Sequence, residues 1–324
     1  DRTTQANQQW TLTQVPIDCN NDPYGTAYID NCNTCVGGNT GLTACVQDCN
    51  GDWGGTAYVD GCSTCVGGNT GLTACMTIPI KVFLQTPLEA SGSSTMDDTL
   101  RGGGHIPTTS PHTDGLNCNA SVFTPTGNDA IVDWIWIELR SAADNTQVVA
   151  STSAFLQADG DVIKEDGTSV FSMNVPEDDY YVVVNDRNHL GVMTANTVHV
   201  SENTPLINFT DGSTTTYGNN AMKNNSGTYM LWGGDTNNDG VVSFSGGSND
   251  ANVIRTTVLN APGNVLGLLT YEYDGYRDTD INHDGKTSLS GATNDATVIR
   301  TNVLNHPGNI LGLLTYTITE QVPQ

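Results

Sequence analysis

A nine-residue pattern of oxygen-bearing side chains occurs twice in the last third of the chain. It runs from Asp235 to Ser243 and returns 45 residues later, from Asp280 to Ser288. Each copy has Asp, Asn and Asp at its first, third and fifth positions, Gly at the sixth and Ser at the ninth. Alternating oxygen ligands with a glycine at the sharp turn are typical of calcium-binding loops. A single run of this kind also occurs in ordinary turns, so the duplication is what constrains the fold.

We therefore predict two bound calcium ions, Ca2+, one in each loop. The expected ligands are the side chains at positions one, three and five, the carbonyl at position seven, and the serine at position nine, directly or through water. They are Asp235, Asn237, Asp239, Val241 and Ser243 in the first loop, and Asp280, Asn282, Asp284, Lys286 and Ser288 in the second. An EF-hand loop has a bidentate acid at position twelve, which here is Gly246 or Gly291. We predict that Asp250 and Asp295, four residues farther on, close the loops, and that the intervening residues form bulges.

Each loop is followed by a segment with helical periodicity. Asn249 and Asn294 are suited to cap these helices, and Pro262 and Pro307 stand beyond their ends. The apolar residues expected on one side of the helices are Val253, Ile254, Val258, Val298, Ile299 and Val303. Because most of these residues are β-branched and form helices poorly alone, we predict that the helices pack against each other and against the ion-bound loops.

The duplicated loop–helix unit resembles the dockerin module, although its period and its bulge are both longer than in dockerins, so cohesin binding is not expected. Residues 78–324 resemble the carboxy-terminal regions of large secreted bacterial surface proteins more closely. The residues that carry this likeness are the two loops and the runs Gly127–Trp134 and Arg187–Thr194. The resemblance implies a secreted, adhesin-like role and implies no particular biochemical activity.

A second duplication, built on cysteine, occupies residues 18–77. The unit that begins at Asp18 returns 30 residues later at Asp48, and each unit contains four cysteines. Four thiols can bind zinc, but in an extracellular setting they predict two disulfides per unit, with three connectivities open. A unit with so few large apolar residues needs such covalent links to fold. Cys118 is a ninth cysteine without an obvious partner.

The cysteine-rich units also carry acids at alternate positions. They are Asp18 and Asp22, then Asp48 and Asp52, followed by Asp30 and Asp60. This pattern loosely resembles thrombospondin type-3 repeats, which implies further calcium sites. Ordinary Asx turns are the alternative interpretation, because the glycine of the loop is missing from the first unit.

The middle of the chain alternates apolar and polar residues between turn signals. The expected strands are 80–84, 130–139, 147–154, 169–175, 180–185, 197–201 and 206–209. Seven short strands predict an antiparallel β-sandwich of Ig-like or transthyretin-like type. Trp134 and Trp136 lie on one face of the second strand, either as a platform for sugar stacking or covered by neighbouring segments.

These patterns predict a mainly β chain with four parts: an N-terminal arm (1–17), two disulfide-rich repeats (18–77), a β-sandwich (78–230) and a dockerin-like pair of calcium loops (231–324). A net charge of −24 argues against nucleic acid or an anionic membrane as a partner. No apolar run reaches the ~18 residues of a membrane span. Because the chain begins with Asp1, we expect a processed, secreted form.

We therefore expect a non-enzymatic extracellular protein that builds surface structure or mediates adhesion to itself, to other surface proteins or to glycans. The arm around Trp10 and Leu12 has strand-like composition and either pairs with a neighbouring subunit, giving a filament, or is a disordered tether. The alternative function is a carbohydrate- or protein-binding accessory module of a secreted enzyme or adhesin. The loop with His105 and His112 is the remaining candidate for catalysis or metal binding, and no motif of a known hydrolase accompanies it.

Overall fold

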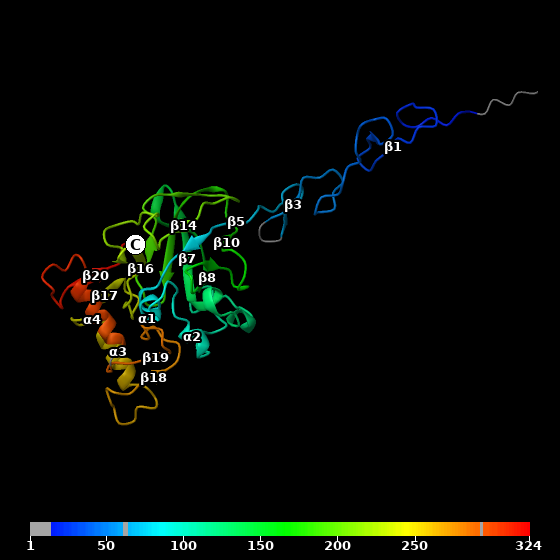
Figure 1. Cartoon of the computed structure of the whole chain (residues 1–324). Coiled ribbons are helices and arrows are strands. Elements are labelled where there is room, and N and C mark those ends of the chain that lie inside the picture. The colour runs from blue at the N-terminus through cyan, green and yellow to red at the C-terminus, as the bar shows by residue number, and fades with distance from the viewer. Residues whose placement is uncertain (1–13, 61–63, 292–293) are drawn as a thin grey trace, which may run out of the picture. The chain divides into compact units, whose positions relative to one another are not determined.

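The computed structural model describes residues 14–60, 64–291 and 294–324. Most of the predicted N-terminal arm, residues 1–13, lies outside them. The chain divides into two compact units, Asp1–Ala74 and Cys75–Gln324, which we call the disulfide unit and the sheet–loop unit. The chain is mainly β, as predicted (Figure 1), and the regular elements described in the disulfide unit are short strands.

The disulfide unit contains two copies of the same small hairpin. Strand β1 (Tyr28–Ile29) pairs with β2 (Cys35–Val36), and β3 (Tyr58–Val59) pairs with β4 (Cys65–Val66) in the same register. The disulfides join Cys19 to Cys35, Cys32 to Cys45 and Cys49 to Cys65. Cys75 is disulfide-bonded as well. The prediction of disulfides is confirmed, and the first repeat adopts the connectivity of first cysteine to third and second to fourth.

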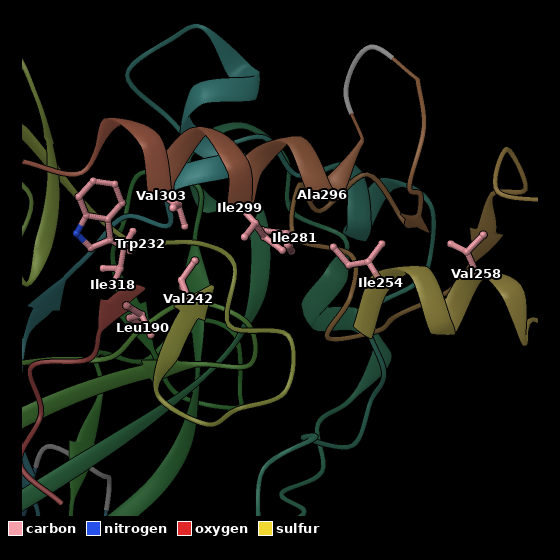
Figure 2. Close-up of a cluster of buried hydrophobic side chains, with 10 residues drawn as sticks. All are labelled: Leu190, Trp232, Val242, Ile254, Val258, Ile281, Ala296, Ile299, Val303 and Ile318. Carbon is pink, nitrogen blue, oxygen red and sulfur yellow. The ribbon is translucent and has the colours of Figure 1, made fainter. Parts of the chain in front are cut away.

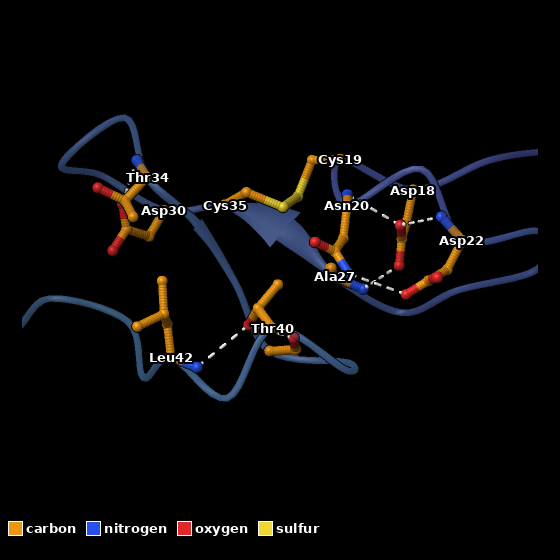
Figure 3. The surroundings of a disulfide bond; sticks show 11 residues. Asp18, Cys19, Asn20, Asp22, Ala27, Asp30, Thr34, Cys35, Thr40 and Leu42 are labelled. Carbon is orange, nitrogen blue, oxygen red and sulfur yellow. Dashed lines mark hydrogen bonds between the residues drawn. A yellow bond between two sulfur atoms is a disulfide. The ribbon is translucent and has the colours of Figure 1, made fainter.

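The acids of these repeats accept hydrogen bonds from backbone amides. Asp18 accepts from Asn20, Asp22 and Ala27 at 2.9 to 3.0 Å, and Figure 3 shows this arrangement beside the Cys19–Cys35 disulfide. Asp48 accepts from the three corresponding amides of the second repeat. The amide of Ala27 contributes most to holding the pKa of Asp18 below its ordinary value. These bonds give the acids a structural role that requires no ion.

The sheet–loop unit is built around one six-stranded antiparallel sheet. Its order is β12 (Val192–Met193), β11 (Asp178–Asp186), β7 (Ile131–Ser141), β8 (Asp144–Gln157) and β9 (Val162–Ile163), while β13 (Val198–Val200) also pairs with β11. Trp134 on β7 is fully buried, and its ring centroid lies 3.9 Å from that of Phe155. Trp136 is half-buried. Neighbouring segments therefore cover Trp134, the second of the two interpretations above.

Short ladders and helices surround this sheet (Figure 1). The ladders are β5 (Met76–Thr77) with β10 (Ser172–Met173), β6 (Ile80–Lys81) with β14 (Ile207–Asn208), and β15 (Met222–Asn225) with β16 (Thr228–Leu231). The helices are α1 (Gln85–Ser91) and α2 (Thr99–Gly102), with single 3₁₀ turns at Ala120–Phe123 and Gly127–Asp129. Each of the seven expected strands overlaps an observed one, whereas β5, β9, β12, β15, β16 and the short helices were not predicted.

The duplicated segment contributes helices α3 (Asp250–Leu259) and α4 (Asp295–Asn305). As predicted, Asn249 caps α3 by accepting from the Asn252 amide at 2.9 Å, and Asn294 caps α4 by accepting from Thr297 at 3.0 Å. Two ladders accompany the helices: β17 (Val241–Ser243) with β20 (Thr317–Thr319), and β18 (Tyr273–Asp274) with β19 (Lys286–Thr287).

A buried apolar cluster joins the two helices to the rest of the unit. Ile254 and Val258 from α3 belong to one cluster with Ile299 and Val303 from α4, and all four are fully buried (Figure 2). Leu190 and Trp232, which precede the duplicated segment, belong to the same cluster. The mutual packing of the helices is therefore as predicted, and one core extends across the expected boundary near residue 230.

Candidate metal centre

The first loop, residues 235–243, folds around the carboxylate of Asp235. The amides of Asp239 and Gly240 donate to the two carboxylate oxygens of Asp235 at 3.1 and 2.9 Å. Gly240 has a φ of 76°, in the left-handed region that this turn requires and that glycine adopts readily. The side chains of Asn237 and Asp239 lie together, with the Asn237 amide nitrogen 2.9 Å from Asp239. Three of the predicted ligands therefore gather at one side of the loop.

Asp250 returns to this loop from the first turn of α3. Its carboxylate accepts from the amide of Thr236 at 2.8 Å and from the amide of Ser243 at 2.7 Å. The hydroxyl of Ser243 donates to the same carboxylate at 3.1 Å. The intervening residues thus bulge outward and bring the acid to the loop, although Asp250 is seven residues beyond Ser243.

The second loop, residues 280–288, repeats this geometry. The amides of Asp284 and Gly285 donate to Asp280 at 3.2 and 3.0 Å. Asp295 accepts from the amides of Ile281 and Ser288 at 2.8 and 2.7 Å. The seventh positions, Val241 and Lys286, begin β17 and β19. The two loops, which lie 45 residues apart in the sequence, therefore have the same geometry.

These loops bury carboxylates close to one another. Asp250, Asp280 and Asp295 are fully buried and Asp235 is 5 % exposed. Burial, together with the negative charge of Asp250, raises the pKa of Asp235 to about 7. Burial, reinforced by Asp295, raises the pKa of Asp280 to about 8 although the Arg187 charge opposes the rise. Burial likewise raises the pKa of Asp295 to about 7. Each loop therefore gathers negative charge that water does not solvate.

The segment Arg187–His189, at the end of β11, holds both loops to the sheet. The backbone carbonyl of Asn188 accepts from the amide of Asp235 at 3.1 Å, and its side-chain amide donates to the carbonyl of Asp280 at 2.8 Å. The Arg187 guanidinium binds Asp133 of β7 at 2.9 Å and also donates to the carbonyls of Arg277 and Asp280. In the sequence, the run Arg187–Thr194 stands out only through its likeness to secreted surface proteins. No spacing in the sequence indicates that it contacts the loops.

His105 and His112, the remaining candidates, lie in different surroundings. The ring of His105 packs on the turn of the second loop, because a Cβ added to Gly285 would lie 2.6 Å from it. The ring of His112 lies beside Trp136, with centroids 5.6 Å apart, and burial lowers the pKa of His112. Within the described ranges, neither histidine belongs to a cluster of three metal-binding side chains. Cys118 is a half-buried free thiol, and burial raises its pKa.

Comparison with models of protein families, with curated proteins and with solved structures finds no match to this chain. In the part of the chain that the structure describes, no helix is both long and apolar enough to cross a membrane. The functional conclusion must therefore come from the loops themselves.

Proposed function

We propose that the sheet–loop unit binds two calcium ions and that the chain is a non-enzymatic, extracellular structural or adhesive protein stabilised by calcium and disulfides. The observation that carries the proposal is the return of a buried acid, Asp250 or Asp295, to each of two loops that already expose aligned oxygen side chains. In the described residues, none of the buried acids of either loop forms an ion pair with a basic side chain.

The chemistry of the ligand set favours calcium over other divalent ions. All proposed ligand atoms are oxygens from carboxylates, amides, carbonyls and hydroxyls, the set that hard cations prefer. Calcium accepts six to eight such ligands in flexible geometry, whereas magnesium requires a near-ideal octahedron and retains its waters. A loop that supplies alternate side chains, one carbonyl and a closing acid matches the calcium requirement.

Bound calcium would act mainly on stability. Two carboxylates ~5 Å apart repel each other by about 3 kcal/mol at an effective dielectric of ~20, and a divalent ion reverses this repulsion. At calcium about 100-fold above its dissociation constant, each site adds about 2.7 kcal/mol to folding. The apolar side chains of α3 and α4 are committed to a shared core, which fits a scaffold rather than a sensor that opens a groove.

Calorimetric titration of the full chain, after removal of metal with a chelator, tests this function. We expect two calcium ions per chain and a large rise in melting temperature on binding. Magnesium titrated at the same concentrations is the control and should bind far more weakly. Binding of fewer than two calcium ions would contradict the proposal.

Extracellular location and self-assembly are parts of the same proposal. The disulfides support an oxidising compartment. Self-association would use the arm, residues 1–17, as an added strand. Electron microscopy of the protein with calcium, with chelator and without residues 1–17 tests this part. Particles that stay monomeric at high concentration in all three conditions would refute assembly without affecting the calcium proposal.

A protein-binding accessory module is the second candidate, and one observation favours it. The turns that follow α3 and α4 present matching apolar side chains to solvent: Val265 and Leu266 are 87 % and 79 % exposed, and Ile310 and Leu311 are 92 % and 79 % exposed. Asn264 and Asn309 fix these turns by hydrogen bonds to Leu268 and Leu313. A pull-down with the L266S/L311S double variant as control tests this candidate. A partner that is retained by the variant would argue against these turns as the binding surface.

For the fold, we propose that the six-stranded sheet is one layer of a sandwich of Ig-like or transthyretin-like type, and that the short ladders form the other layer. We also propose that the two loop–helix units form a dockerin-like pair. An experimental structure of the calcium-bound chain tests both assignments.

A further inference from the structure

A second group of potential metal ligands lies where the second loop meets the end of β11. It consists of Asp186, His189 and His283, with Asn188 between them. The exposed fraction is 6 % for Asp186, 3 % for His189, 2 % for His283 and 0 % for Asn188. One ligand atom from each of Asp186, His189 and His283 lies within 4.8 Å of the other two. None of these four residues is a proposed calcium ligand.

The donor atoms are spaced like ligands around a single ion. His189 Nδ1 lies 2.8 Å from Asp186 Oδ2 and 2.8 Å from Asn188 Oδ1. His283 Nε2 lies 3.3 Å from Asn188 Oδ1. Ligands about 2.1 Å from a metal ion are roughly 3.0 Å apart in octahedral geometry and roughly 3.4 Å apart in tetrahedral geometry. The cluster is therefore compact enough to coordinate an ion with small adjustments of its side chains.

Hydrogen bonds alone leave this group incompletely satisfied. His189 Nδ1 carries at most one hydrogen, yet it faces two oxygen acceptors at the same distance. In addition, Asp186 Oδ1, His189 Nε2 and His283 Nδ1 are buried and have no hydrogen-bond partner among the described residues. Buried polar atoms almost always have a partner, so three such atoms in one cluster point to a ligand.

Metal coordination explains the contacts of His189 Nδ1 and His283 Nε2, and it leaves His189 Nε2 without a hydrogen-bond partner among the described residues. If both imidazoles give a lone pair to the ion, through His189 Nδ1 and His283 Nε2, their hydrogens reside on the opposite nitrogens. His283 Nδ1 then faces the buried carboxylate of Asp133, whose Oδ2 is 3.6 Å away. A carboxylate behind a metal-binding histidine is a common means of orienting the ring. Asp133 is itself paired with Arg187 at 2.9 Å, so Asp186 is the carboxylate that remains to balance a bound cation.

We propose that Asp186, Asn188, His189 and His283 bind one divalent transition-metal ion, best matched by zinc, at a site that shares no ligand with the proposed calcium sites, although His283 belongs to the second loop. Two imidazole nitrogens and two oxygens suit zinc or a neighbouring first-row metal, whereas calcium selects sites made of oxygen alone. A surface cleft of about 370 Å³ is lined in part by Asp186, Arg187 and His112, so the cluster lies beneath the wall of a cleft, with the Asp186 side chain itself fully buried.

The test uses the full chain, stripped of metal and then saturated with calcium, so that the calcium loops do not compete for zinc. Zinc chloride is titrated by calorimetry, and the metal content is measured after gel filtration. We expect one zinc per chain in the unmodified protein.

His283→Phe keeps an aromatic ring at a position that is not a calcium ligand, and it should weaken zinc binding at least about tenfold while two calcium ions stay bound. His199→Ala removes an exposed histidine that contacts Asp179 and Glu177 and should leave zinc binding unchanged.

Absence of zinc binding in the unmodified chain, or full-strength binding in His283→Phe, would overturn the proposal. Loss of binding in His199→Ala would place the zinc at the surface instead and would equally overturn it. If His283→Phe loses calcium and does not fold, cobalt chloride added to the unmodified protein decides. Absorption bands of cobalt bound by nitrogen and oxygen support the site, and a spectrum of free aqueous cobalt refutes it. Because zinc is measured separately from calcium, failure here leaves the calcium proposal standing.

Discussion

The side-chain amide of Asn188 donates a 2.8 Å hydrogen bond to the carbonyl of Asp280, the first residue of the second loop. The backbone carbonyl of the same Asn188 accepts from the amide of Asp235, the first residue of the first loop. One fully buried residue at the end of β11 thus contacts equivalent positions of two repeats. Asn188 therefore links the sheet to both loops, beside the contacts that Arg187 makes with the second loop.

Asn188→Ala should affect the two loops unequally. The substitution removes the bond to Asp280 but keeps the backbone bond to Asp235, so calcium affinity should fall mainly at the second loop. Loss of a buried hydrogen bond predicts destabilisation of about 1–3 kcal/mol. Two-site calorimetry in zinc-free buffer and denaturant unfolding measure these effects. Asn196→Ala, at an exposed position, is the control, and equal weakening of both sites would contradict the prediction.

Asp250→Asn and Asp295→Asn should each abolish one calcium site. Each change removes a charged ligand at constant size and replaces one of two carboxylate oxygens that accept from backbone amides by a donor, so folding is checked by circular dichroism before the titration. We expect the titration to fall from two ions to one in each single variant. Asp274→Asn, on exposed β18, should retain both ions. Two ions bound to either closing-acid variant would show that the acid is only a structural partner of the loop.

Calcium affinity should rise steeply between pH 6 and pH 8. The raised pKa values of Asp235, Asp280 and Asp295, at about 7, 8 and 7, mean that these acids hold protons in the ion-free folded state. Calcium must displace those protons. For each proton released on binding, the calcium affinity rises about tenfold per pH unit. Since the folded pKa values of these three acids exceed the unfolded ones, their contribution to the stability of the ion-free chain is fully present below about pH 4 and is lost as pH rises toward 8.

Melting curves in chelator across this pH range, and calorimetry in buffers of different protonation enthalpy, measure both effects. A flat calcium affinity from pH 6 to pH 8 would mean that the acids are already ionised before calcium binds.

Ile299→Ala should destabilise the calcium-bound chain far more than Ile310→Ala. Ile299 is fully buried between α3 and α4, whereas Ile310 is 92 % exposed. A cavity in the shared core predicts a loss of about 2–5 kcal/mol, and the exposed substitution predicts about 0.5 kcal/mol or less. Denaturant unfolding in saturating calcium gives both values. Similar losses in the two variants would show that the core does not form as described.

The disulfide unit should keep its structure without calcium and lose it on reduction. Asp18, Asp30 and Asp48 already accept several backbone amides each, so a chelator should leave hydrogen exchange in residues 14–60 unchanged. The double variant Cys19→Ser/Cys35→Ser should raise exchange in the first repeat and leave the second repeat, with its Cys49–Cys65 bond, protected. Chelator-dependent exchange in the unmodified repeats would instead favour calcium sites there.

Local patterns explain what could be predicted from the sequence. The caps Asn249 and Asn294 and the apolar sides of α3 and α4 follow from spacing within one turn or one helix. The bonds from Asp250 to Thr236 and Ser243 depend on how a bulge folds, so the sequence indicates only that an acid is available. The Cys19–Cys35 pairing belongs to one of the three connectivities that the sequence leaves open. The cluster of Asp186, His189 and His283 joins positions 94 to 97 residues apart, and no spacing rule brings such positions together.

The disulfide repeats close on themselves: in the first copy both disulfides, and the bonds of Asp18 and Asp30, stay within residues 18–45. A copy can therefore be gained or lost by unequal recombination without creating an unmatched cysteine or an orphaned acid elsewhere. The number of repeats can then change during evolution without disturbing the fold, and it sets the length of the disulfide unit. Chains that differ in this number would differ in the length of the disulfide unit while keeping the same loops at residues 235–243 and 280–288.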